Sequence, residues 1–151
     1  MNYKETLEYI HSIPKFNRIL GNALLEKLLN KMGNPQDNLK FIHIGGTNGK
    51  GSTCTMVSQI LTEAGYKTGL FTSPFLKFFN ERIKINGVPI SNSDLADIAS
   101  YVKKITEKYD AFVSEFAFDT AVAFEYFNRQ NCDFVILEVG LGGKLDATNI
   151  I

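Results

Sequence analysis

"IGGTNGKGST", residues 44–53, lies between a short apolar run and a stretch with helical spacing. The run before it, Phe41 to Ile44, predicts a strand, and Lys50 to Ala64 predicts a helix closed by Gly65. Four glycines at such a junction let the backbone N–H groups turn inward. The helix start adds unpaired amides and the positive end of its dipole. We therefore expect this loop to hold an anion.

The side chains of the loop favour the β and γ phosphates of ATP. Lys50 brings a mobile positive charge, and Ser52 and Thr53 bring hydroxyls. The spacing departs from the common phosphate loop, because only three residues, instead of four, separate Gly45 from Gly49-Lys50, and Gly51 follows the lysine. A glycine-rich turn without a ligand is the alternative. The residues predicted to bind ATP are Gly46, Thr47, Asn48, Gly49, Lys50, Gly51, Ser52 and Thr53.

The remaining pattern predicts an α/β protein, a mostly parallel sheet flanked by helices as in P-loop NTPases. Lys67 to Thr72 is a second strand candidate, and a strand, a helix and a strand within about thirty residues predict a parallel βαβ unit. Phe134 to Val139, "FVILEV", is apolar on both sides, as expected inside a covered parallel sheet. The other predicted elements are helices over Tyr3–Ile13, Asn22–Met32, Ser91–Ile105 and Glu115–Asn131, and a hairpin of Arg82–Asn86 and Val88–Ile90 around Asn86-Gly87.

The composition fits one globular domain and excludes several classes of protein. The chain has 151 residues, 44% of them hydrophobic, and its 16 basic and 16 acidic side chains cancel, so nucleic acid is not an expected partner. No segment approaches the roughly 20 apolar residues of a membrane span, and the first residues lack a signal peptide's apolar core. We expect a cytoplasmic protein without a membrane partner. Cys54 and Cys132 are predicted to be buried thiols, and His11 and His43 to be structural.

Four motifs together resemble one enzyme family. The string GTNGKGS looks like the phosphate loop of the Mur ligase superfamily, and more narrowly of its folylpolyglutamate synthase and dihydrofolate synthase branch. "TSPFL" at 72–76, "NERIKINGVPI" at 80–90 and "EVGLGGKLDATN" at 138–149 resemble the same branch in the same order. The resemblance covers the whole chain. It implies the fold of the central, ATP-binding domain of a Mur ligase.

The resemblance implies an ATP-dependent ligase. In the family, ATP phosphorylates a carboxylate of folate or dihydropteroate, and the amine of L-glutamate attacks the acyl phosphate to form an amide. Such phosphoryl transfer depends on positioning and charge neutralisation. Lys50 and Glu138 match the catalytic positions, and Ser73 and Glu138 match the Mg²⁺ ligands. An ordinary turn at Ser73-Pro74 and a surface acid at Glu138 are the alternatives.

The resemblance also implies a substrate pocket. An aspartate can pair with the N–H groups of a pterin and a phenylalanine can stack on its ring. The alternative makes Ser114 a helix N-cap and Phe116 a core residue. Glu81 and Arg82 either order the loop before the hairpin or form a solvated ion pair. The residues predicted to bind the substrate are Arg82, Ser114, Phe116, Asp146 and Ala147.

The chain departs from the family pattern in several side chains and in length. Leu24, Phe75, Ala117 and Lys144 stand where relatives often carry arginine, histidine, an acid and arginine, which leaves open the choice between dihydropteroate and folyl polyglutamate. Because family members are much longer, we expect residues 1–151 to be an amino-terminal part of the ATP-binding domain that binds nucleotide weakly and does not ligate alone.

Three further expectations concern assembly and identity. A complete enzyme is expected to be a monomer, whereas the short chain is expected to expose a sheet edge and self-associate. A peptidoglycan-type Mur ligase is one alternative, although Gly51 stands where those enzymes usually carry Ser or Thr. A non-catalytic nucleotide-binding module is the other.

Overall fold

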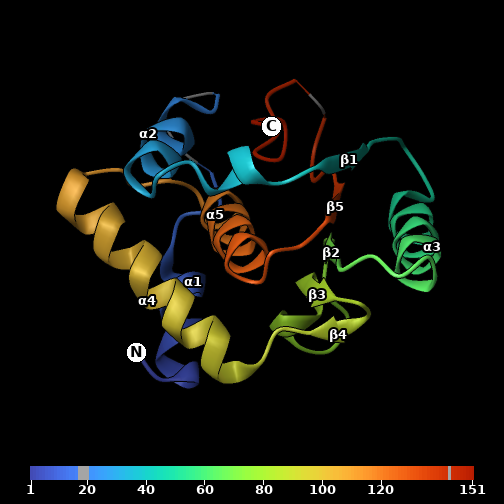
Figure 1. Cartoon of the computed structure of the whole chain (residues 1–151). Coiled ribbons are helices and arrows are strands. Elements are labelled where there is room, and N and C mark those ends of the chain that lie inside the picture. Colours follow the sequence, from blue (N-terminus) through green and yellow to red (C-terminus); the bar gives the residue numbers. More distant parts are fainter. Residues whose placement is uncertain (17–20, 143) are drawn as a thin grey trace.

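The protein folds around a five-stranded mixed sheet with strand order β1-β5-β2-β3-β4 (Figure 1). In this computed structural model the described residues are 1–16, 21–142 and 144–151. Strands β1 (Phe41–Ile44), β5 (Phe134–Glu138) and β2 (Thr68–Phe71) are parallel. Strand β3 (Ile83–Ile85) is antiparallel to β2, and β4 (Val88–Pro89) is antiparallel to β3.

Strand β5 occupies the centre of the parallel part because both of its faces are apolar. Val135 and Leu137 join the larger core, while Ile136 between them joins a smaller cluster on the other face. The sequence predicted β1 and β2 as the strands of one βαβ unit. Their directions agree with that prediction, but each pairs with β5, which lies between them.

Helices cover the two faces of the sheet unequally (Figure 1). Helix α3 (Lys50–Glu63) packs alone on one face, where its Cys54 clusters with Leu70 and Ile136 of the sheet. The other face carries the larger core, built around α5 (Glu115–Arg129), whose segment 117–127 is buried throughout. The remaining helices on that side are α1 (Tyr3–Ser12), α2 (Ala23–Lys31) and α4 (Asn92–Tyr109). The fold also contains two short 3-10 turns, η1 (Pro35–Asn38) and η2 (Phe79–Arg82).

The element boundaries agree with the predicted ones to within a few residues, with one informative difference. The predicted strand over Arg82–Asn86 begins at Ile83, because Arg82 closes the turn η2. The hairpin itself is confirmed, since Asn86 and Gly87 adopt φ angles of 48° and 79°. The difference matters because it sets Arg82 beside α5 instead of in the sheet.

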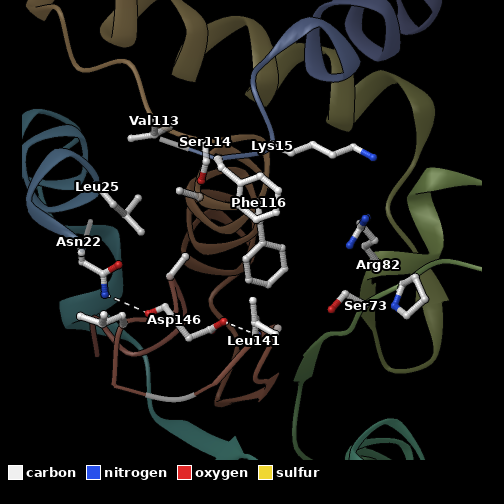
Figure 2. Close-up of a pocket in the computed structure, with 17 residues that line it drawn as sticks. Lys15, Asn22, Leu25, Ser73, Arg82, Val113, Ser114, Phe116, Leu141 and Asp146 are labelled. Atoms are coloured by element: carbon white, nitrogen blue, oxygen red, sulfur yellow. Dashed lines mark hydrogen bonds between the residues drawn. The ribbon is translucent and has the colours of Figure 1, made fainter. Parts of the chain in front are cut away.

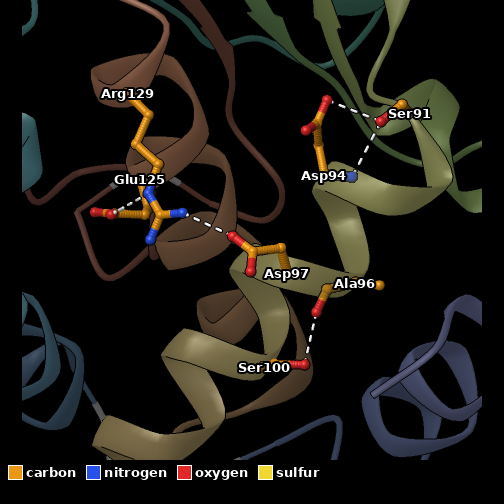
Figure 3. Close-up of polar contacts among 7 residues, drawn as sticks. All are labelled: Ser91, Asp94, Ala96, Asp97, Ser100, Glu125 and Arg129. Atoms are coloured by element: carbon orange, nitrogen blue, oxygen red, sulfur yellow. Dashed lines mark hydrogen bonds and ion pairs between the residues drawn. The ribbon is translucent and has the colours of Figure 1, made fainter.

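Polar contacts fix how α4 begins and how it meets α5 (Figure 3). The Ser91 hydroxyl accepts the N–H of Asp94 at 3.0 Å, which caps α4. Arg129 on α5 joins Glu125 at 2.7 Å and Asp97 of α4 at 2.9 Å. Asp97 is largely exposed, so its ion pair with Arg129 contributes little free energy, and the buried apolar side chains of both helices dominate their packing.

Two further observations complete the fold. Cys54 and Cys132 are buried free thiols, as predicted. Within residues 1–16, 21–142 and 144–151, no helix is long and apolar enough to cross a membrane.

Candidate functional site

The loop between β1 and α3 presents its backbone to solvent. Residues 45–49 are exposed, and Gly49, the N-cap of α3, adopts a φ of 73° that favours glycine. No side chain caps this helix. The N–H groups of its first turn lack intrahelical partners by geometry, so they are available to an anion.

Lys50 lies at the first position of α3 and folds back over the loop. Its Nζ donates to the carbonyl oxygen of Gly46 at 2.8 Å. The side chains of Thr53 and Thr55 instead donate to carbonyls one turn back, at Gly49 and Gly51. The ammonium group of Lys50 is therefore held above the loop that carries the free amides.

Glu138 and Ser73 meet at the carboxyl ends of β5 and β2. The Glu138 side chain is buried, at 6% exposure, and its Oε2 accepts the N–H of Ser73 at 2.9 Å. The peptide bond between Ser73 and Pro74 is cis. The burial of Glu138 excludes the surface acid that the sequence left open as an alternative. The carboxylate faces inward.

Glu138 also reaches the start of α3. A Cβ added at Gly51 would lie 3.5 Å from Oε1 of Glu138. Burial, and to a lesser extent the nearby Glu138 charge, raises the pKa of the Cys54 thiol to about 11. The structure thus brings Ser73, Glu138 and the first turn of α3 together. Hard oxygen ligands of this kind suit Mg²⁺.

A cavity of about 570 Å³ opens beside these residues (Figure 2). It collects every residue that the sequence assigned to substrate binding, and Ser73 as well; these are Ser73, Arg82, Ser114, Phe116, Asp146 and Ala147. Most of the other lining side chains are apolar, including Leu25, Val113 and Leu141. A flat, largely apolar ligand with a few polar edges is complementary to such a lining.

Phe116 forms one wall of the cavity. Its ring stacks on Phe71, with centroids 5.7 Å apart and an interplanar angle of 24°. A Cβ at Gly140 would lie 2.7 Å from this ring and 3.1 Å from the Asp146 carboxylate, so only glycine fits there. Ser114 stands at the N-cap of α5 but makes no capping hydrogen bond. Its hydroxyl therefore remains available to the cavity.

Asp146 is buried and organises the loop that ends the cavity. Its carboxylate accepts N–H bonds from Leu141 at 2.8 Å and Thr148 at 3.0 Å, and a further bond from the Thr148 hydroxyl. Nε2 of His43 lies 2.8 Å from that hydroxyl. Because the hydroxyl donates to Asp146, it accepts the proton of His43. The hydrogen-bonded series His43–Thr148–Asp146 links β1 to the cavity. Gly143, in the same loop as Asp146, lies outside the described residues.

Glu81 and Arg82 have different partners, so the solvated ion pair between them, one of the two alternatives from the sequence, does not form. The Glu81 carboxylate accepts N–H bonds from Leu76 at 2.8 Å and Lys77 at 3.3 Å, which orders the loop before η2. These backbone bonds lower the pKa of Glu81. The guanidinium of Arg82 lies over Phe75 and comes within 3.8 Å of Asp119 on α5.

Sequence reasoning missed several residues at this site. Asn22 donates from its side chain to the carbonyl of Asp146 at 2.9 Å, and Lys15 and Gly140 line the cavity. Of these only Gly140 carried a signal, as part of the glycine-rich segment after β5. Asn22 and Lys15 reach the cavity from the other end of the chain. Among the described residues, no group of three His, Cys, Asp or Glu side chains is placed to hold a metal ion.

Comparisons with known proteins find relatives named folylpolyglutamate synthase or dihydrofolate synthase. No protein-family model matches it. The chain is 40% identical over 156 residues to the folylpolyglutamate synthase of Lacticaseibacillus casei, covering all of this chain and 36% of that protein. It is 40% identical over 154 residues to the dihydrofolate synthase/folylpolyglutamate synthase of Bacillus subtilis, covering 99% of this chain and again 36% of the relative.

Solved structures agree with these sequence matches. A folylpolyglutamate synthase complex with AMPPCP and folate superposes with a TM-score of 0.94 at 40% identity, over all of this chain and 38% of that one. The folylpolyglutamate synthase of Thermotoga maritima gives a TM-score of 0.91 at 44% identity, over 99% of this chain and 35% of its own. The chain thus spans somewhat more than a third of the length of the proteins it matches.

Proposed function

The chain belongs to the folylpolyglutamate synthase and dihydrofolate synthase family, and from this premise we propose that it carries the phosphate site and the folate cavity of an ATP-dependent ligase. The ligase would join L-glutamate to a carboxylate of folate or dihydropteroate. Residues 1–151 would form part of its ATP-binding domain. A solved relative bound to AMPPCP and folate supports both ligands.

One contact carries the proposal. Ser73 lines the cavity, and its N–H is bonded to Glu138, whose carboxylate faces the first turn of α3. The place where the substrate's carboxylate would lie is therefore next to the place where the nucleotide's phosphates would lie. A ligase that phosphorylates a carboxylate needs those two groups in contact.

The phosphate loop would bind ATP through its backbone and Lys50. The loop from Gly46 and the first residues of α3 up to Ser52 offer free amides, where the helix dipole favours negative charge. The Nζ of Lys50 would exchange its bond to Gly46 for the β and γ phosphates. Its charge then offsets the charge that develops on the transferring phosphoryl group.

Ser73 and Glu138 would hold Mg²⁺. Oε2 of Glu138 is occupied by the Ser73 N–H, while Oε1 faces the start of α3. Figure 2 shows the Ser73 hydroxyl directed into the cavity. One carboxylate and one hydroxyl suit Mg²⁺, which keeps several waters and takes further oxygens from phosphates. When bound, the ion would neutralise charge on the phosphates.

The cavity would hold the folate so that its carboxylate points toward Ser73. Phe116 would stack on the flat ring, and Ser114, Asp146 and the adjoining Ala147 would meet its polar edge. An oxygen of the substrate carboxylate attacks the γ-phosphorus and ADP leaves. The amine of glutamate then attacks the acyl carbon and expels phosphate. Lys50 and Glu138 would act by positioning and charge in the first step.

Calorimetric titration of the protein with β,γ-methylene ATP in excess Mg²⁺ tests the phosphate site. We expect binding to the unmodified protein and a loss of affinity of about tenfold or more in Lys50→Ala, because a charge-assisted contact is worth roughly 1.5–3 kcal/mol. Lys104→Ala, an exposed lysine on α4, is the matched control and should bind normally. Failure of the unmodified protein to bind, or equal binding by Lys50→Ala, would contradict the proposal.

A further inference from the structure

Arg82 and Asp119 lie close together in the protein without a hydrogen bond between them. Nε of Arg82 is 3.8 Å from Oδ2 of Asp119, which is within ion-pair range but beyond hydrogen-bond distance. Both oxygens of Asp119, and Nε and Nη1 of Arg82, are buried and have no hydrogen-bond partner among the described residues. Buried polar groups are normally bonded, so this incompletely bonded pair calls for a physical explanation.

Arg82 faces the proposed substrate cavity as well as Asp119. It retains 14% exposure, and it lines the cavity of about 570 Å³ together with Ser73. Figure 2 shows its guanidinium on the same side of that cavity as Ser73. Asp119 on α5 is 1% exposed and does not line this first cavity, but both residues line a second cavity of about 540 Å³. The guanidinium therefore has room to move between a ligand and Asp119.

Four other ionisable side chains line the second cavity with Asp119. They are Arg82 from η2, Glu115 from α5 itself, His11 from α1 and Lys15 from the segment after α1. Glu115 is engaged by Nδ1 of His11 at 3.1 Å. Burial raises the pKa of Asp119 to about 8, against the lowering effect of Arg82 and with a smaller raising effect of Glu115. Near pH 7 the carboxyl is therefore largely protonated and does not offset the Arg82 charge.

The charge on Asp119 decides which acceptor attracts Arg82 more strongly. A neutral carboxyl attracts the guanidinium weakly, so a carboxylate in the first cavity can take its free N–H groups in charge-assisted bonds. An ionised carboxyl in a desolvated place attracts it strongly. A small movement from 3.8 Å then completes a hydrogen-bonded ion pair with Asp119. The two acceptors compete for the same donors.

Resting on the proposed function, we propose that Asp119 is a positioning residue for Arg82: with its proton it leaves the guanidinium to a carboxylate ligand, and without its proton it holds the guanidinium against α5. The affinity of the first cavity for a carboxylate ligand then falls as pH rises through the titration of Asp119. Ligand binding near the midpoint also takes up a proton, because the ligand draws Arg82 away from Asp119 and so favours the neutral carboxyl.

NMR titration of the unliganded protein tests the coupling between the two side chains. The carboxyl carbon of Asp119 and the Nε nitrogen of Arg82 should shift with one midpoint between about pH 6.5 and about pH 9.5. The Arg82 shift should disappear in Asp119→Asn. His11→Gln removes the other side chain of the cavity whose charge can change near neutral pH, and it should leave both shifts in place. A carboxyl carbon that does not titrate in this range, or an Arg82 signal that does not follow it, overturns the proposal.

Calorimetric titration with pteroate tests the effect on binding. The affinity of Asp119→Asn relative to the unmodified protein should rise by about tenfold between about pH 6.5 and about pH 9.5, the effect of one pKa unit between the free and bound states. Titration of the ligand itself affects both proteins alike and cancels in this ratio. Asp97→Asn removes an exposed acid paired with Arg129 and is the matched control, whose ratio should not change with pH. Buffers of different ionisation enthalpy should reveal proton uptake near pH 8 in the unmodified protein and not in Asp119→Asn.

The outcomes separate this inference from the proposed function. Pteroate binding with a ratio that stays constant with pH overturns the control by Asp119 and leaves the proposed function in place. Absence of pteroate binding by every protein overturns the proposed function, and the NMR titration alone then decides the coupling. Glu115→Gln gives a second test that keeps Asp119: loss of this charge should lower the midpoints of Asp119 and Arg82 together. A midpoint that moves for Asp119 alone overturns the proposal.

Discussion

At the scale of single residues, Asp119 makes the stability of the fold depend on pH. The sequence alone does not predict this dependence. The carboxyl is buried on α5, and desolvation raises its pKa from 3.8 to about 8, a larger effect than the attraction of Arg82. In the unfolded chain it loses its proton near pH 4. Between about pH 4 and pH 8 the folded state binds the extra proton, so this group lowers the free energy of unfolding as pH rises.

Replacing Asp119 by Asn should remove that dependence. We expect the unfolding temperature of Asp119→Asn, relative to the unmodified protein, to rise between pH 5 and pH 9. The rise should be at least about 3 °C, which roughly 1 kcal/mol produces in a domain of this size. Scanning calorimetry at five pH values measures it. A difference that is constant over this range, or that falls, would show that Asp119 is not neutral when buried.

The residues that could be predicted are those whose position follows from the order of strand and loop. Ser73 comes directly after one apolar strand, and Glu138 stands at the end of another. Parallel strands bring their carboxyl ends to one edge of the sheet. Asp119 could not be found in this way. It lies inside a helical run, and its partner Arg82 belongs to a turn far earlier in the chain. Only the tertiary packing brings the two together.

At the scale of elements, periodicity predicted the helices and strands but not their neighbours. Apolar spacing located α3 and β5 within a residue or so. The insertion of β5 between β1 and β2 was not predicted, because apolar faces show that a strand is buried and not beside which strand it pairs. The cavities could not be predicted for the same reason. Their walls come from α1, α5 and the loops after β2 and β5, and the sequence does not show that these elements lie together.

The first turn of α3 offers a way to separate stability from function. Gly51 has ordinary helical geometry, and a methyl group there would meet Glu138 at 3.5 Å, a normal contact. Gly51→Ala should therefore leave the fold intact and stabilise it by up to about 1 kcal/mol, the usual gain of alanine over glycine in a helix. The methyl group should nevertheless weaken binding of Mg²⁺ and β,γ-methylene ATP, because it fills space between the helix start and Glu138.

Urea unfolding measures the stability of Gly51→Ala, and calorimetry on the same preparation measures its affinity for nucleotide. Gly65→Ala is a useful comparison, since Gly65 follows α3 at its far end with a φ of 90°. That variant should lose stability and keep nucleotide affinity. If Gly51→Ala bound nucleotide as tightly as the unmodified protein, the space between α3 and Glu138 would not belong to the ligand.

At the scale of the whole molecule, the fold brings three chain segments to one end of a parallel sheet. The phosphate loop follows β1, Ser73 follows β2, and Glu138 ends β5. These strands are neighbours in the sheet, so their carboxyl ends lie side by side. The apolar cavity opens at the same edge, so the proposed substrate carboxylate and nucleotide phosphate would meet there.

The central claim is that Ser73 and Glu138 hold Mg²⁺ against a nucleotide bound at Lys50. Its most direct test is the affinity of β,γ-methylene ATP with excess Mg²⁺ and with EDTA, for the unmodified protein, Ser73→Ala and Glu138→Gln. Mg²⁺ should tighten binding to the unmodified protein by about tenfold or more, and each variant should lose most of that gain while its metal-free affinity stays the same. A full Mg²⁺ gain in both variants would contradict the claim.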